Sequence, residues 1–130
     1  MKLNGKRLRQ YKVLMMFLLF DVISTLIFIK DPYEEISYIP RYFMIYFNNN
    51  YLGLITYYIS LSIVLYYVIA SLSNLELLSD NAFHYFFMIL CAYDFGYAAT
   101  SWFWKIYMPI KVLIGGIFYL LIDKYWISLK

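Results

Sequence analysis

Charged residues and cysteines are scarce in this sequence of 130 residues. Asp, Glu, Lys and Arg together make up 15% of it, whereas soluble domains carry about 25%. Cys91 is the single cysteine, so the sequence offers no intrachain disulfide and no Cys/His cluster of the kind that holds a structural metal. The catalytic signatures HExxH, Gly-x-Ser with a histidine, and a glycine-rich phosphate loop are also missing. We therefore expect no catalytic residues, no metal and no cofactor.

Apolar residues are abundant instead, at 64% of the sequence. They form four runs of a length suited to crossing a membrane, for which roughly 20 helical residues are needed. These runs cover residues 13–29, 51–72, 82–104 and 106–122. They do not alternate in segments of about ten residues, as the strands of an outer-membrane barrel do. The sequence predicts an all-α, polytopic membrane protein in which residues 1–130 form a single domain of four transmembrane helices.

The basic residues give the predicted helices a direction. If the N-terminus is inside, the inner side carries Lys2, Lys6, Arg7, Arg9, Lys12, Lys124 and Lys130, and the outer side carries Lys30, Arg41 and Lys105. The positive-inside rule then places both termini on the cytoplasmic or inner side of a prokaryotic cell membrane or an organelle inner membrane. Because this topology, or contact with anionic lipids, explains the net charge of +3, we expect no nucleic-acid partner.

The loop formed by residues 31–50 carries its own helix signals. Asp31 precedes Pro32, and Glu34 follows three residues after the aspartate. A capping side chain, a proline at the first helical position and an acidic first turn are typical of a helix start. Pro40 is expected to end this short helix. The loop is therefore predicted to form a short helical cap on the outer face.

Two carboxylates stand near the middle of predicted spans. Asp21 lies within 13–29 and Asp94 within 82–104, and both spans run from the inner to the outer side. Residues three or four positions apart share a helix face, so Ser24 and Thr25 accompany Asp21, and Tyr97 accompanies Asp94. Either these groups bond across helices and hold the bundle together, or they form a proton or ion site. The first interpretation is preferred, because no basic or metal-binding partner converges on the carboxylates.

Two ionic pairs are suggested by position. Lys111 is the candidate counter-ion of Asp94 across the turn at Trp104–Lys105. The alternative for Lys111 is to extend toward the outer surface, because side chains tilt toward the N-terminus of their own helix. The second candidate pair is Asp80 and His84, four residues apart, which could shuttle protons at a membrane entrance. The preferred alternative is that His84 is an ordinary surface group.

Small and hydroxylated residues mark the expected contacts between helices. They let backbones approach closely and can bond across a helix interface. The positions are Gly53, Thr56, Ser60, Gly115 and Gly116.

Residues 17–60 resemble a family of small, mainly archaeal and bacterial, four-helix membrane proteins known as a domain of unknown function. The stretch "DVIST", which starts at Asp21, is similar to the family's Asp-x-x-Thr-Thr element. Glu35, Pro40 and Arg41 are loosely similar to its Glu-x-Asn-Pro element and nearby arginine, although "ISYIPR" stands here in place of the Asn-Pro dipeptide. The resemblance implies a bundle of four spans and no particular activity.

Aromatic residues are unusually frequent, with 16 Tyr and 11 Phe, accompanied by 6 Met. Helices with this much aromatic surface are suited to packing against membrane lipids and other subunits. We therefore expect a non-catalytic accessory or structural subunit of a larger membrane complex, of the energy-converting or oxidative kind. A hetero-oligomer is favoured over a homodimer. The alternative is a small proton-coupled transporter or proton relay that uses the midplane carboxylates and works as a homodimer.

Overall fold

The chain is described by a computed structural model that covers residues 3, 5–35, 37–76 and 78–126. Within these residues every regular element is a helix, so the predicted all-α fold is confirmed for this part of the chain. The elements are α1 (Gly5–Phe28), η1 (Pro32–Glu34), α2 (Tyr38–Phe47), α3 (Asn50–Asn74), α4 (Asp80–Tyr93), η2 (Asp94–Ala99) and α5 (Met108–Trp126).

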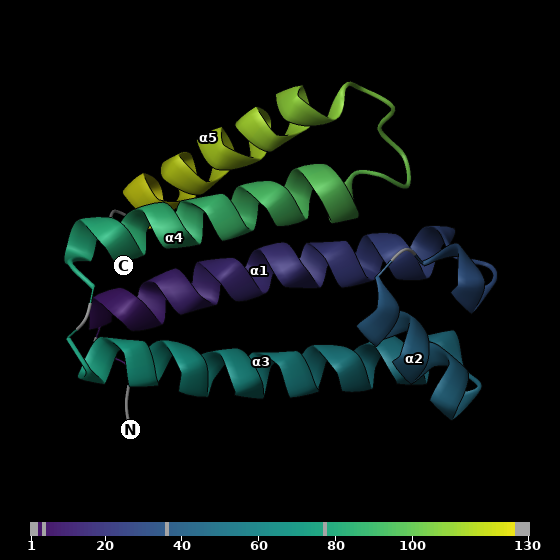
Figure 1. The fold of residues 1–130 in the computed structure, drawn as a ribbon. Helices are drawn as coiled ribbons and strands as arrows, with labels where there is room; N and C mark the ends of the chain where they lie inside the picture. The colour runs from purple at the N-terminus through teal and green to yellow at the C-terminus, as the bar shows by residue number, and fades with distance from the viewer. Residues whose placement is uncertain (1–2, 4, 36, 77, 127–130) are drawn as a thin grey trace.

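The four long helices lie side by side, with α1 between α3 and α4 (Figure 1). α5 packs mainly on α4 and η2, and α2 packs on α3. α1 and α4 run in one direction, whereas α3 and α5 run in the other (Figure 1). α1 begins where α5 ends, as the ion pair between Arg9 and Asp123 shows. We call this the Arg7 end of the bundle and the opposite end, where α2 lies, the α2 end.

Two helices, α1 and α3, are long and apolar enough to cross a membrane. They have 24 and 25 residues. α4 has 14 residues before it passes into η2, and α5 includes Lys111, Asp123 and Lys124 among its 19. The four-span arrangement therefore stays a prediction, whereas two helices meet the criteria of length and composition.

Several helix ends differ from the predicted limits. α1 starts at Gly5 rather than at residue 13, because Arg7 and Gln10 are buried and continue its packed face. The predicted span 82–104 ends as a π-helix, η2, in which the backbone N–H of Thr100 donates to the carbonyl of Phe95. A connection over residues 100–107 then replaces the expected tight turn at 104–105.

The segment before α2 follows its local sequence signals. The Asp31 side chain accepts the backbone N–H of Tyr33, and Glu34 Oε1 accepts those of Lys30 and Asp31, which completes a capping box around η1. Pro40 does not end a helix as predicted. It lies in the first turn of α2, where the backbone N–H groups make no hydrogen bond within the helix and the missing N–H of proline is tolerated.

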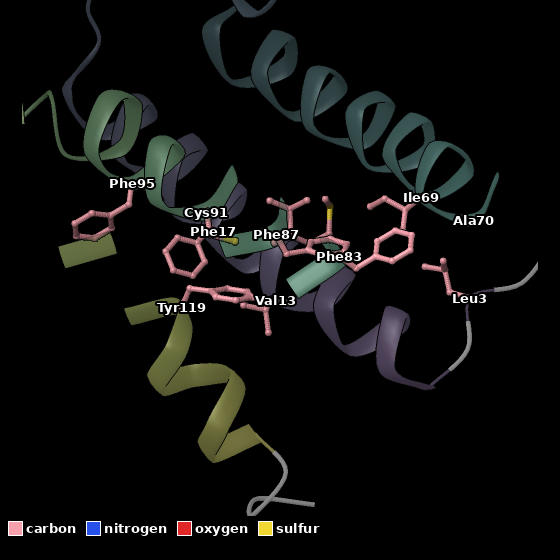
Figure 2. Packing of buried hydrophobic residues seen from close by; sticks show 12 residues of the cluster. Leu3, Val13, Phe17, Ile69, Ala70, Phe83, Phe87, Cys91, Phe95 and Tyr119 are labelled. Carbon is pink, nitrogen blue, oxygen red and sulfur yellow. The ribbon is translucent and has the colours of Figure 1, made fainter. Parts of the chain in front are cut away.

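Most buried apolar side chains form one cluster to which all four long helices contribute (Figure 2). Val13 and Phe17 come from α1, Ile69 from α3, Phe87 from α4 and Tyr119 from α5. A smaller cluster lies beneath α2 and consists of Val22, Ile29, Met44 and Leu54. α2 is therefore a packed part of the fold rather than an isolated loop helix.

Close backbone approach explains two of the predicted packing glycines. A Cβ added at Gly53 would lie 2.5 Å from Met44 Cα, where α2 meets α3. A Cβ at Gly115 would lie 2.8 Å from Phe95 Cβ, whereas the nearest atom to a Cβ at Gly116 is 3.8 Å away, an ordinary contact.

The other packing positions are less tightly enclosed. Thr56 and Ser60 are half-buried on α3. The sequence interpretation also missed Gly96 in η2, where an added Cβ would lie 2.6 Å from the backbone nitrogen of Val112. The tightest approach of α5 to its neighbours therefore includes η2 as well as α4.

Candidate functional site

The carboxyl groups of Asp21 and Asp94 meet where α1 passes the start of η2. Both side chains line the same cavity, and the two carboxyl groups interact electrostatically. Two carboxylates at close range repel each other unless one of them is protonated. Asp94 Oδ2 is buried, and no described residue gives it a hydrogen bond. The structure thus places two acidic side chains together where α1 passes η2.

The pair lines a cavity of about 330 Å³ between α1, α3 and the segment from α4 to η2. We call this cavity the carboxyl groove. Its polar side chains are Asp21, Ser37, Tyr57, Tyr93, Asp94 and Tyr97, and its apolar ones are Leu14, Leu18, Leu61, Leu65, Leu90 and Ala98. None of these residues is basic, so the groove contains no built-in counter-ion for the two aspartates.

Ser24 and Thr25 do not line the groove with Asp21. Both are buried. The Thr25 hydroxyl donates to the Asp21 backbone carbonyl at 2.9 Å and accepts the indole N–H of Trp102 at 3.1 Å. Thr25 therefore fixes the connection after η2 against α1. Of the two carboxylates and the polar residues predicted to share their helix faces, the groove contains Asp21, Asp94 and Tyr97.

Lys111 does not pair with Asp94 in the described structure. Its side chain is 6% exposed, and Nζ donates to the backbone carbonyl of Trp104 at 3.1 Å. The side chain points back along its helix toward the connection, as the tilt of helical side chains predicts. It does not extend to the surface, because the 100–107 connection is long enough to supply a carbonyl acceptor nearby.

A buried polar cluster at the Arg7 end was missed by the sequence interpretation. Arg7 is 3% exposed, donates to Gln10 Oε1 at 2.9 Å, forms an ion pair with Asp80 and lies 4.0 Å above the Phe83 ring. The signal was present in the spacing, since Arg7, Gln10 and Leu14 share the face of α1 that turns toward the core.

A second set of charges joins α1 and α4 to the last turns of α5. Arg9 Nε lies 3.2 Å from Asp123 Oδ1, and His84 Nδ1 lies 3.9 Å from the other oxygen of Asp123. The suggested pairing of His84 with Asp80 is therefore wrong, because Asp80 is paired with Lys6 and Arg7. Arg7 and Arg9 therefore join helices through ion pairs, in addition to the topology signal predicted for them.

Two tyrosine hydroxyls attach α3 to α1. Tyr11 donates to the carbonyl of Ser62 at 2.8 Å, and Tyr58 donates to the carbonyl of Met15 at 3.0 Å. These bonds hold the two walls of the carboxyl groove together at its Arg7 end. Tyr57 lines the groove beside Tyr58, so neighbouring tyrosines have different roles.

Comparison of the chain with family models, with curated proteins and with solved structures finds no match. The resemblance of residues 17–60 to a four-helix membrane family thus stays a prediction. Within the described part of the chain, no three His, Cys, Asp or Glu side chains gather as a metal site would require.

Proposed function

We propose that the chain is a four-span membrane protein that binds and releases a proton at the Asp21–Asp94 pair, as a small proton-coupled transporter or proton relay. The observation that carries this proposal is that two carboxyl groups line one groove whose walls contain no basic residue. Two carboxylates in contact repel unless a proton is shared between them. Buried ionisable groups in membrane helices often mark proton or ion paths.

The arrangement of the helices supports the four-span part of the proposal. The 14 residues of α4 continue into the six of η2, which gives a helical segment of about the length that a membrane requires. The charges of α5 lie near its two ends, at Lys111 and at Asp123 with Lys124. In this arrangement the Arg7 end, with most of the basic residues, faces the cytoplasmic or inner side.

An accessory subunit of a larger membrane complex is the second candidate. It is supported by the surface of α3, which contacts α1 and α2 but leaves Ile55, Ile59 and Ile63 about half exposed. Such a face suits lipid chains or a helix of another subunit. The contact between the aspartates favours the proton-binding function over this interpretation, which the sequence alone had placed first.

Infrared titration of the purified protein tests the proposal. The carbonyl stretch of a protonated carboxyl group should appear as the pH is lowered, and Asp21→Asn and Asp94→Asn should each remove the titration of the coupled pair. Asp123→Asn is the matched control, because the Asp123 carboxylate is held by Arg9. A spectrum in which the double variant Asp21→Asn/Asp94→Asn keeps the wild-type titration would contradict the proposal.

Reconstituted vesicles and mass measurement separate the two candidate functions. A transporter or relay should move protons down a pH gradient in the wild type, and Asp21→Asn should stop this movement without loss of thermal stability. An accessory subunit should instead be recovered from mild detergent with a heterologous partner. Its aspartate variants should then misassemble or lose stability.

A further inference from the structure

The carboxyl groove has different chemistry on either side of the aspartate pair. On the side nearer the Arg7 end its walls are Tyr93 and leucines, among them Leu14, Leu65 and Leu90. On the side nearer the α2 end its walls include Tyr97 and Ser37. The direction of the helices fixes this assignment, because α1 and α4 run toward the α2 end whereas α3 runs away from it.

A second cavity, of about 340 Å³, lies at the α2 end of the groove. It shares Ser37, Tyr97 and Ala98 with the carboxyl groove. Because three residues form walls of both cavities, the two spaces adjoin. Cavities of this size with polar walls have room for several water molecules.

The second cavity is acidic at the point where it adjoins the groove. Its walls include Glu34, Glu35 and Lys105. The Glu34 carboxylate is occupied by the backbone N–H groups of Lys30 and Asp31. Glu35 Oε1 accepts the backbone N–H of Ser37 at 3.2 Å, which places this carboxylate beside a residue that both cavities share.

The bundle is closed between the aspartate pair and the Arg7 end. Phe87 and Cys91 of α4 are fully buried, and Leu14 of α1 is 2% exposed. Figure 2 shows Phe87 and Cys91 within the main apolar cluster. The carboxyl groove therefore ends against a packed core, in which the polar side chains of Gln10 and Tyr119 are also enclosed.

We propose that the two cavities form one water path that leads protons from the α2 end to the aspartate pair, with Glu35 as the first carboxylate and no path to the Arg7 end. This inference rests on the proposed proton-binding function and adds the side from which the site is reached. In this conformation the site exchanges protons with one side of the membrane only. Transport across the membrane then requires a second conformation in which the leucine-lined half opens.

Cysteine labelling tests the path independently of proton binding. Ala98→Cys and Leu90→Cys, each in a Cys91→Ala chain, place a thiol four residues to either side of Asp94, and both positions line the groove. A thiol reacts with a water-soluble maleimide as the thiolate, which needs water around it. We expect the cysteine at position 98 to react at least about tenfold faster than that at position 90 in detergent micelles.

Two controls keep the labelling result interpretable. Both variants should react equally after denaturation in SDS, and circular dichroism should show the wild-type helix content. If Ala98→Cys does not fold, Ser101→Cys is the replacement, because Ser101 lines the second cavity and the substitution is conservative. Equal rates at positions 90 and 98, a faster rate at 90, or no reaction at either would overturn the proposed path.

The role of Glu35 is tested by a matched pair of substitutions. Glu35→Gln should slow proton exchange at the aspartates, measured by infrared detection after a pH jump, without changing the amplitude. Glu34→Gln should leave the rate unchanged, because a glutamine can still accept the capping hydrogen bonds. Equal rates in both variants would remove Glu35 from the path. If the wild-type protein itself shows no infrared signal of a carboxyl group that titrates, the proposed function is contradicted instead.

Discussion

Replacing Gly53 by alanine should destabilise the contact between α2 and α3. The added Cβ would lie 2.5 Å from Met44 Cα and 2.7 Å from both Met44 N and Phe43 O, and all three are backbone atoms that cannot rotate away. Gly116→Ala is the matched control. There the added Cβ meets only Ala92 Cβ, at 3.8 Å, in the same kind of helical environment.

The two substitutions share one energy term and differ in another. Alanine is favoured over glycine in a helix by about 1 kcal/mol, and this gain applies to both variants. Overpacking a well-filled contact costs about 1–3 kcal/mol, and this cost applies to Gly53 alone. We therefore expect the free energy of unfolding of Gly53→Ala to lie about 1–3 kcal/mol below that of Gly116→Ala.

Unfolding in mixed micelles with increasing SDS, followed by circular dichroism, measures this difference. Hydrogen exchange supplies a local measurement, since amide protons of α2 around Met44 should exchange faster in Gly53→Ala but not in Gly116→Ala. If the two variants unfold at the same SDS fraction and protect α2 equally, then α2 does not pack on Gly53 as described.

Two further predictions concern the ends of the bundle. Arg7→Ala should lower the free energy of unfolding by about 1.5–3 kcal/mol, the range for hydrogen bonds to charged groups, because Arg7 bonds Gln10 and Asp80. The exposed control is Lys12→Ala. Equal stability of the two variants in the SDS titration would contradict the prediction. The backbone N–H groups of Asp31 and Lys30 hold the pKa of the Glu34 carboxyl below its ordinary value. The ionised Glu34 side chain therefore stabilises η1 fully at a pH above the ordinary pKa. This stabilisation is lost as the pH falls through the lowered pKa of the folded state. An NMR titration of Glu34 with an ordinary midpoint would disprove this reasoning.

Local patterns predicted the features that depend on neighbouring residues. The apolar runs indicated helices, and Asp31 with Glu34 indicated a capped helix start, which the structure confirms. The central positions of Asp21 and Asp94 were visible from span lengths alone. Whether their side chains meet was not, because this depends on the rotation of α1 against η2.

Features that depend on distant contacts were missed or misplaced. Pro40 was expected to end a helix, yet it lies in the first turn of α2. A proline is tolerated there because the first N–H groups of a helix have no hydrogen-bond partner within it. Lys111 was considered a partner of Asp94, yet the π-helical turn of η2 and the connection after it bring the Trp104 carbonyl to the lysine. Arg7 was counted only as part of a topology signal or lipid contact, because its partner Asp80 lies 73 positions away.

The ion pairs at the Arg7 end impose an order on biosynthesis. Arg7 pairs with Asp80 and Arg9 pairs with Asp123, so α1 obtains these ionic partners only after α4 and α5 have been made. Until then α1 carries Arg7 and Arg9 without their acidic partners, and a nascent chain that stops before Asp123 lacks the pair that joins α1 to α5. Closure of the bundle at the Arg7 end is therefore coupled to synthesis of the last turns of α5.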